Sequence, residues 1–249
     1  MKSKNIFITG GTSGIGLSLA KLYISKNCNV AICGRDLSKI PNDLIDIIEA
    51  YQVDVTILEQ VENALKSFQD KHKKIDLVII NAGISVGKKQ ATPNFQDSLK
   101  VTNTNVIGFL NTVHPSIDIM IKQKYGHIVA VSSVAGFVGL PGASSYSASK
   151  SYITKYCESL SIDMKSFNID ISVICPGFID TPLTKRNDHS MPFIMNSEKA
   201  ALLISNAIGN KKDLYIFPWQ MKAVITLLNK MPRSLYRKLF NLKLFNYSK

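Results

Sequence analysis

The stretch Thr9-Gly10-Gly11-Thr12-Ser13-Gly14-Ile15-Gly16 decides the fold, because it joins a short apolar run to an amphipathic one. Glycines let the backbone approach a pyrophosphate, and a helix N-terminus offers unpaired N–H groups and a positive dipole. A glycine cluster alone is weak evidence, but this position favours dinucleotide binding over a plain tight turn. The expected contacts are Gly10, Thr12, Ser13, Gly14, Ile15 and Gly16.

Short apolar runs alternate with amphipathic stretches along the chain. The runs predict strands at Asn5–Thr9, Asn29–Cys33, Ala50–Asp54, Asp76–Ile80, His127–Val131, Ile169–Cys175 and Leu214–Phe217. The stretches predict helices at Gly14–Lys26, Ile57–Lys71, Asn94–Lys124, Tyr146–Phe167 and Ser197–Gly209. Thr56-Ile57-Leu58-Glu59 is a capping-box sequence, and Ser197 is a candidate N-cap. Strands apolar on both faces, alternating with helices, predict an α/β fold: a doubly wound parallel sheet (Rossmann fold) with helices on both faces.

Length and composition indicate one domain over residues 1–249, with 45% apolar and 19% charged residues and no linker or repeat. No apolar run approaches the roughly 20 residues of a membrane span, and the first apolar run is too short for a signal peptide. We therefore expect a cytoplasmic protein. The cysteines are few and scattered, so we expect them to be small buried side chains. The histidines lie far apart and show no metal-ligand spacing, so we expect no metal site. These residues are Cys28, Cys33, Cys157, Cys175, His72, His114, His127 and His189.

The net charge of +12 is concentrated at the C-terminus, where no acidic residue follows Asp213. The basic residues there are Lys222, Lys230, Arg233, Arg237, Lys238, Lys243 and Lys249. Residues 218–249 read as a helical tail, with helices at Trp219–Lys230 and Pro232–Asn246. Such a composition fits a helix that lies on an anionic membrane surface. The favoured interpretation is instead a pair of helices that packs on protein and covers either the pocket or a partner subunit. Nucleic-acid binding is not expected, because no recognition motif is present.

The end of the second predicted strand bears on the choice of nicotinamide cofactor. NAD-preferring Rossmann proteins usually place an acid there, to bind the ribose 2′-hydroxyl. This chain has Gly34 at that position and Arg35 next, and an arginine can pair with a 2′-phosphate. NADP is therefore the preferred cofactor and NAD a possible one. The alternative is a solvated turn arginine, with Asp36 as a helix cap.

Four polar residues form the candidate catalytic set. Tyr146 and Lys150 are spaced to share one helix face, where a cation can lower the pKa of a phenol and make it a usable acid or base. Ser133 ends an apolar strand, at the sheet edge where ligands bind in α/β proteins. Asn105 interrupts a predicted helix despite the low helix propensity of asparagine, which indicates a packing or a polar role.

Together these residues resemble the short-chain dehydrogenase/reductase family, from Asn5 to about Thr181. The matching positions are Thr9–Gly16, Asp54, Val55, Asn81, Ala82, Gly83, Asn105, Ser133, Tyr146, Lys150, Pro176, Gly177 and Thr181. One departure is visible: the family's N-N-A-G reads Ile80-Asn81-Ala82-Gly83, which can cost a hydrogen bond at the strand end but does not touch the chemistry.

The resemblance implies a role for each residue. Tyr146 exchanges a proton with the substrate oxygen, Lys150 binds the nicotinamide ribose and lowers the Tyr146 pKa, and Ser133 polarises the substrate. Asn105 anchors a water for proton relay. Asp54 and Val55 border the adenine, and Asn81, Ala82 and Gly83 flank the adenosine ribose. Pro176, Gly177, Ile179 and Thr181 line the nicotinamide end.

The resemblance also implies a substrate lid over residues 183–197 and an oligomer formed through the two long helices. The lid begins polar and ends with Met191-Pro192-Phe193-Ile194-Met195, which suits an apolar substrate or ordinary packing equally. The predicted function is NADPH-dependent reduction of an apolar or acyl carbonyl to an alcohol, by a homodimer or homotetramer. The alternative is a non-catalytic NADP-binding regulator or scaffold, which has no physical need for all four catalytic residues.

Overall fold

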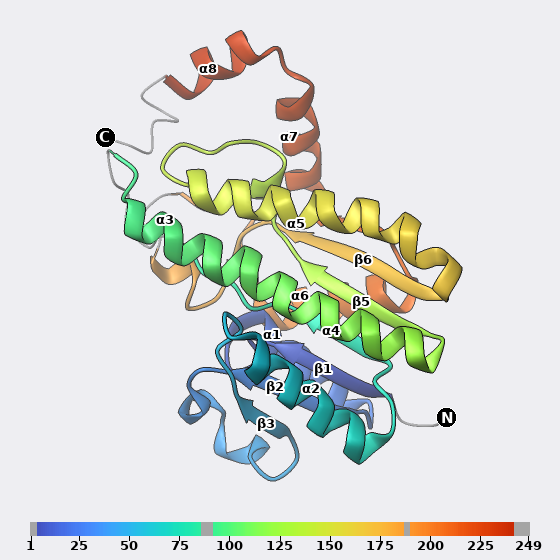
Figure 1. The fold of residues 1–249 in the computed structure, drawn as a ribbon. Coiled ribbons are helices and arrows are strands. Elements are labelled where there is room, and N and C mark those ends of the chain that lie inside the picture. Colours follow the sequence, from blue (N-terminus) through green and yellow to red (C-terminus); the bar gives the residue numbers. More distant parts are fainter. Residues whose placement is uncertain (1–3, 86–91, 187–189, 242–249) are drawn as a thin grey trace.

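A computed structural model describes residues 4–85, 92–186 and 190–241, and its centre is a seven-stranded parallel sheet (Figure 1). The strands are β1 Asn5–Thr9, β2 Asn29–Gly34, β3 Glu49–Gln52, β4 Leu77–Ile80, β5 Gly126–Val131, β6 Ile169–Pro176 and β9 Leu214–Phe217. They lie in the order β3-β2-β1-β4-β5-β6-β9. Because the order reverses beside β1, the loops after β1 and β4 meet at a crevice, where open α/β sheets bind ligands.

Helices cover both faces of this sheet (Figure 1), as the predicted doubly wound fold requires. The helices are α1 Gly14–Ser25, α2 Leu58–His72, α3 Phe95–Thr102, α4 Gly108–Gln123, α5 Ser144–Asp163, α6 Ser197–Gly209, α7 Trp219–Lys230 and α8 Arg233–Asn241. Two-residue strands β7, Ile179–Asp180, and β8, Met195–Asn196, form a second small sheet. Among the described residues, no helix is long and apolar enough to cross a membrane.

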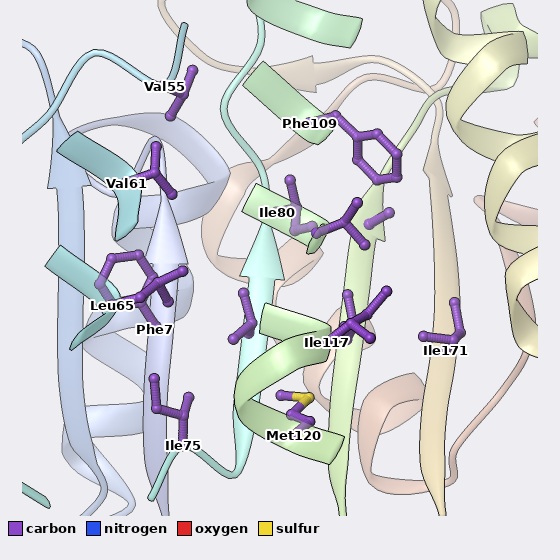
Figure 2. Packing of buried hydrophobic residues seen from close by; sticks show 14 of the residues in the cluster. Phe7, Val55, Val61, Leu65, Ile75, Ile80, Phe109, Ile117, Met120 and Ile171 are labelled. Atoms are coloured by element: carbon purple, nitrogen blue, oxygen red, sulfur yellow. The ribbon is translucent and has the colours of Figure 1, made fainter. Parts of the chain in front are cut away.

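Two hydrophobic clusters hold the layers together, because successive side chains of a buried strand point to opposite faces. Phe7 of β1 packs with α2, α4 and α5, in a layer to which Leu65, Ile117 and Met120 contribute (Figure 2). Its neighbours Ile6 and Ile8 belong to the other layer, with α1 and α6. The cysteines are free thiols, and three of them are buried. In the described ranges, no group of three or more His, Cys, Asp or Glu side chains could hold a metal ion.

Local details differ from the sequence predictions. Strand β3 ends at Gln52 rather than Asp54, and its residues alternate between half-buried and exposed because it is an edge strand. The long helix predicted at Asn94–Lys124 is interrupted by a π-helical turn at Asn103–Ile107. Helix α5 starts at Ser144 and passes into a 3-10 turn at Met164.

Both predicted helix caps are wrong. Helix α2 begins after Ile57, and the Thr56 hydroxyl donates to Asp54 Oδ1 at 2.8 Å instead of capping the helix. Asn196 caps α6 by accepting from Lys199 N at 2.8 Å, one residue before the predicted Ser197. At α6 the Asn196 side chain forms the capping bond that was expected of Ser197, whereas at α2 Asp54 accepts from both the amide and the hydroxyl of Thr56 and so holds Thr56 outside the helix.

Candidate active site

The turn between β1 and α1 has the shape of a phosphate-binding loop. Gly10 and Gly14 adopt φ values of +63° and +54°, which L side chains rarely adopt. A Cβ at Gly16 would lie 2.3 Å from the Gly10 carbonyl oxygen, so this glycine allows α1 to approach the turn. Ser13 precedes α1, and within the described chain its side chain makes no capping hydrogen bond. The first N–H groups of α1 can therefore bind an anion.

A cleft of about 470 Å³ opens above this turn. Twelve predicted cofactor residues line it: Gly10, Thr12, Ser13, Gly14, Ile15, Arg35, Asp54, Val55, Asn81, Ala82, Gly83 and Thr181. Eight further residues that were not predicted to bind the cofactor also line it: Gly34, Asp36, Lys39, Val53, Ile84, Thr104, Pro182 and Leu183. Glycines, an open helix N-terminus and cations at one end fit the pyrophosphate and ribose of a dinucleotide.

The end of β2 has no room for the acid that NAD-preferring proteins carry. A Cβ at Gly34 would lie 2.8 Å from Thr12 Cγ2 and 3.0 Å from Thr12 Oγ1. An acidic side chain would have to displace Thr12 from the glycine turn. Arg35 and Lys39, both exposed, lie on the same wall of the cleft.

Asp36, between these cations, is engaged locally. Its Oδ1 accepts from Ser38 N and Oγ at 3.1 and 2.6 Å, and its Oδ2 lies 3.0 Å from Lys39 Nζ. Hydrogen bonds from Ser38 and the nearby Lys39 ammonium hold the Asp36 pKa below its usual value. Asp36 therefore caps the 3-10 turn Leu37–Lys39, as the alternative interpretation expected, while Arg35 still lines the cleft.

The loop after β4 forms the opposite wall. Asn81 Nδ2 donates to the carbonyls of Thr9 and Gly10 at 3.2 and 3.0 Å, and Thr9 Oγ1 accepts from Asn81 N and Ala82 N. Side chain and backbone thus tie β4 to the glycine turn, even though Ile80 replaces the family's first asparagine. A Cβ at Gly83 would lie 3.3 Å from both Asn105 Oδ1 and Lys150 Nζ, so a larger residue there would crowd these two side chains.

The fold brings the four predicted catalytic residues to one end of the sheet. Ser133 follows β5 and precedes the 3-10 turn Val134–Gly136, and Tyr146 and Lys150 lie on the first turns of α5. Asn105 lies in the π turn between α3 and α4. A π turn inside a helix is frequent at functional sites, because it changes the direction of a side chain.

Tyr146 and Ser133 form the reactive end of this set. Burial raises the Tyr146 pKa above its usual value of 10.0, and a hydrogen bond with Ser133 opposes that rise. Ser133 Oγ also accepts from Ala135 N at 3.1 Å, so its own hydrogen remains for another partner. The Tyr146 pKa was expected to be lowered, but it is raised, because burial outweighs the hydrogen bond with Ser133.

Lys150 is buried beside them. Its Nζ donates to the Val131 carbonyl at 3.0 Å and lies 5.7 Å from the centre of the Tyr146 ring. Burial lowers the Lys150 pKa from 10.5 to about 8, because little water solvates the ammonium. Ser132 fixes the helix to the strand end, since its hydroxyl donates to the Lys150 carbonyl at 2.8 Å.

Asn105 is fully buried and its amide group is well bonded. Its Oδ1 accepts from Ile84 N at 2.8 Å, and its Nδ2 donates to the Ile84 carbonyl at 2.9 Å and to Ser149 Oγ at 3.0 Å. Both amide hydrogens are used in these bonds. The side chain thus holds the chain after β4 against α5, and its predicted part in a proton relay stays a prediction.

Six predicted cofactor residues do not line the cleft: Gly16, Tyr146, Lys150, Pro176, Gly177 and Ile179. Gly177 packs on the tail, because a Cβ there would lie 2.9 Å from Met221 Cγ and 3.1 Å from Pro218 Cδ. Ile179 is 2% exposed and belongs to the core. Of this group, Tyr146 and Lys150 lie at the catalytic end, and the other four have packing positions.

The lid predicted at 183–197 is partly described, because residues 187–189 lie outside the described chain. Its end forms β8, which pairs with β7 through Ile179 and Met195. Met195 packs against the core beneath, whereas Phe193 and Ile194 are exposed. The apolar end of this segment therefore serves core packing in part and leaves two large side chains at the surface.

Gly136 controls how closely Ser133 approaches α5. A Cβ there would lie 2.8 Å from the Lys150 carbonyl carbon and 3.0 Å from Ser151 N. We expect Gly136→Ala to push the Ser133 turn from the helix and to lower kcat, by up to about 100-fold for a displacement near 1 Å. Gly139→Ala is the control, because its Cβ meets no described atom within 4 Å. The measurement is kcat of both variants by steady-state kinetics. Equal kcat values would contradict the role of Gly136 in placing Ser133.

Comparison with known proteins assigns the family. The sequence profile for short chain dehydrogenases matches residues 4–192. The chain belongs to the short-chain dehydrogenase/reductase family. It is therefore an NAD(P)-dependent oxidoreductase with a Rossmann-like fold.

Individual relatives agree with this assignment. An uncharacterized oxidoreductase of Myxococcus xanthus is 30% identical, over 95% of this chain and 96% of its own length. The 3-oxoacyl-[acyl-carrier-protein] reductase FabG of Chlamydia trachomatis is 33% identical, over 74% of this chain and 77% of its own. A short-chain dehydrogenase/reductase from Burkholderia phymatum, solved with NAD, has the same fold with a TM-score of 0.83, 20% identity and coverage of 92% and 94%. Other solved structures with this fold contain NADP.

Proposed function

We propose that this dehydrogenase reduces an apolar or acyl-type carbonyl to an alcohol, with NADPH as the preferred cofactor. The observation that carries the cofactor choice is the end of β2, where Thr12 fills the space beside Gly34 and two cations line the cleft. A 2′-phosphate suits these cations, and Gly10, Ser13 and Gly14 at the helix N-terminus suit the pyrophosphate.

In the proposed reduction, Tyr146 is the proton donor. Since burial raises its pKa, the phenol is protonated at neutral pH and can donate a proton. NADPH, when bound, supplies the hydride for the substrate carbon. The Tyr146 O–H bond breaks as a proton moves to the carbonyl oxygen, and Ser133 donates a hydrogen bond to the same oxygen. Lys150 then stabilises the Tyr146 phenolate electrostatically until a solvent proton replaces the one transferred.

Two features support an apolar or acyl-type substrate. Phe193 and Ile194 are exposed on the predicted lid. A relative of this chain is named a 3-oxoacyl-[acyl-carrier-protein] reductase.

The test is NADPH oxidation with a panel of apolar ketones, aldehydes and 3-oxoacyl thioesters. We expect turnover with at least one apolar member, and a lower rate with NADH than with NADPH. Tight NADPH binding without turnover on any compound would instead favour the non-catalytic alternative.

The pH dependence should report Lys150. Its side chain is charged below about pH 8 and neutral above, and the charged form is the one we expect to bind the ribose. We therefore expect kcat/KM for NADPH, which reflects the free enzyme, to be level well below pH 8 and to fall about tenfold per pH unit above it. Lys150→Arg should move this fall to higher pH, because a guanidinium stays charged. An unchanged profile in the variant would assign the ionisation to another group.

We also propose a homodimer or homotetramer formed through α4 and α5. On these helices Tyr152 stacks on Tyr156 at 5.7 Å, Tyr156 meets His114 at 3.0 Å, and Ile162 is 75% exposed. Burial of such apolar side chains stabilises association. Light scattering on the protein as it elutes from a size-exclusion column should give the mass of a dimer or a tetramer. The mass of a monomer at micromolar concentration would contradict the proposed oligomer.

A further inference from the structure

Helices α7 and α8 project from the body beyond the end of the sheet that bears the catalytic residues (Figure 1). One side of α7 is anchored: Met221 and Ile225 are buried in a cluster with Val134 and Val138. In α8 the Tyr236 hydroxyl donates to the Gly139 carbonyl, and the Tyr236 ring lies 4.6 Å from Phe240. Both helices are thus held to the turns around the catalytic end, and their remaining sides face outward.

The outward side of α7 is apolar at its centre. Trp219, Ala223 and Leu227 recur at helical spacing and, with Lys222, Thr226 and Lys230, line one open groove. Trp219 is 74% exposed and Leu227 is 67% exposed, which is unusual for side chains of this size. On α8, Leu235 is 52% exposed. We call the exposed residues of α7 and α8 the tail surface.

The charged side chains of the tail surface are all positive. Its cations are Lys222, Lys230, Arg233, Arg237 and Lys238, all of them exposed. No acidic residue follows Asp213 in the whole sequence, so no carboxylate of this segment balances them. A second copy docked through the same surface would bring two cationic sets together, which is unfavourable. The partner that complements exposed tryptophan and leucine among cations is an anionic bilayer.

We propose that the tail surface binds the surface of an anionic lipid bilayer. Trp219, Leu227 and Leu235 would enter the boundary between headgroups and acyl chains, while Lys222 and Lys230 extend along the helix toward lipid phosphates. The contact is interfacial, since no helix among the described residues can span a membrane. Because Met221 packs beside Gly177, and Val134 directly follows Ser133, the bound protein would hold its catalytic end next to the bilayer.

The test uses the single tryptophan of the chain, Trp219, as the probe. Full-length protein is titrated with vesicles of pure phosphatidylcholine, or of phosphatidylcholine with phosphatidylglycerol, at low salt. We expect a blue shift of Trp219 emission and co-sedimentation with the anionic vesicles only, both reversed by high salt. No shift and no co-sedimentation with anionic vesicles at low salt would overturn the proposal.

Matched variants separate this surface from net charge. Each cation near an anionic leaflet strengthens binding about fivefold, so Lys222→Gln with Lys230→Gln should weaken it about 30-fold. Lys21→Gln with Lys66→Gln, exposed positions on α1 and α2, removes the same charge and should leave binding unchanged. Equal losses in both double variants would mean non-specific attraction. A Trp219 shift that depends on protein concentration without vesicles would mean self-association; either result overturns the proposal.

Vesicle binding needs no turnover, so its outcome is independent of the proposed reductase activity. Trp219→Ala with Leu227→Ala, followed by co-sedimentation, tests the apolar part with the charges intact. We expect clearly weaker binding, because both large side chains that would enter the bilayer are truncated. Unchanged binding would show that the exposed apolar side chains do not insert, and would overturn the proposed mode of docking.

Discussion

Tyr146→Phe is expected to reduce turnover by roughly 10³-fold or more while NADPH binding is kept, because the substitution removes only the proton donor. The ring still fills its place beside Lys150, whose Nζ lies 5.7 Å from the ring centre. The Lys150 bond to Val131 and the cleft after β1 do not involve the Tyr146 hydroxyl. The measurement is kcat on a substrate from the panel, with NADPH affinity measured by fluorescence titration.

Tyr152→Phe is the matched control, since it removes a phenol from the same helix outside the catalytic set. We expect its kcat to equal that of the wild type. If Tyr146→Phe kept more than about a tenth of the wild-type kcat, Tyr146 would not be the acid. A loss of NADPH binding in this variant would point to a structural effect instead.

The second large effect concerns the cations at the end of β2. Arg35→Ala should weaken NADPH binding about 10- to 100-fold, because charge-assisted hydrogen bonds contribute about 1.5–3 kcal/mol each. NADH, which lacks the 2′-phosphate, should bind nearly as before. Lys39→Ala should act in the same direction but less, since Lys39 also pairs with Asp36 at 3.0 Å.

The measurement is the affinity for NADPH and for NADH, obtained by titrating each cofactor into wild type, Arg35→Ala and Lys39→Ala. Lys66→Ala, an exposed cation on α2 away from the cleft, controls for the loss of charge. Equal losses of affinity for NADH and NADPH in the Arg35 variant would contradict recognition of the 2′-phosphate. The proposed preference for NADP would then lack its main support.

Features set by local pattern were predictable from the sequence. The glycine turn needs only a strand, a helix and close backbone approach, and Tyr146 and Lys150 need only one helix face. The predicted parallel sheet is confirmed for the same reason, since buried strands and amphipathic helices leave strong periodic patterns.

Features set by long-range packing were not predictable. Lys39 lines the cleft from the 3-10 turn that Asp36 caps, and no local pattern places that turn at the cleft. Thr12 lies against Gly34, although the two residues belong to different loops. Asn105 was singled out for its low helix propensity, but neither the π turn in which it lies nor its bond with the distant Ile84 leaves a local pattern. The Tyr146 pKa depends on burial, which no spacing in the sequence measures.

Transfer of deuterium from the nicotinamide to the substrate carbon is the defining step of the proposed reaction. The protein is incubated with NADPH deuterated at the transferred position of the nicotinamide and with a carbonyl compound from the panel, and the product is analysed by mass spectrometry. We expect an alcohol with one deuterium on the former carbonyl carbon, formed by the wild type and almost absent with Tyr146→Phe. No labelled alcohol from any carbonyl compound, with NADPH tightly bound, would contradict the proposed reaction.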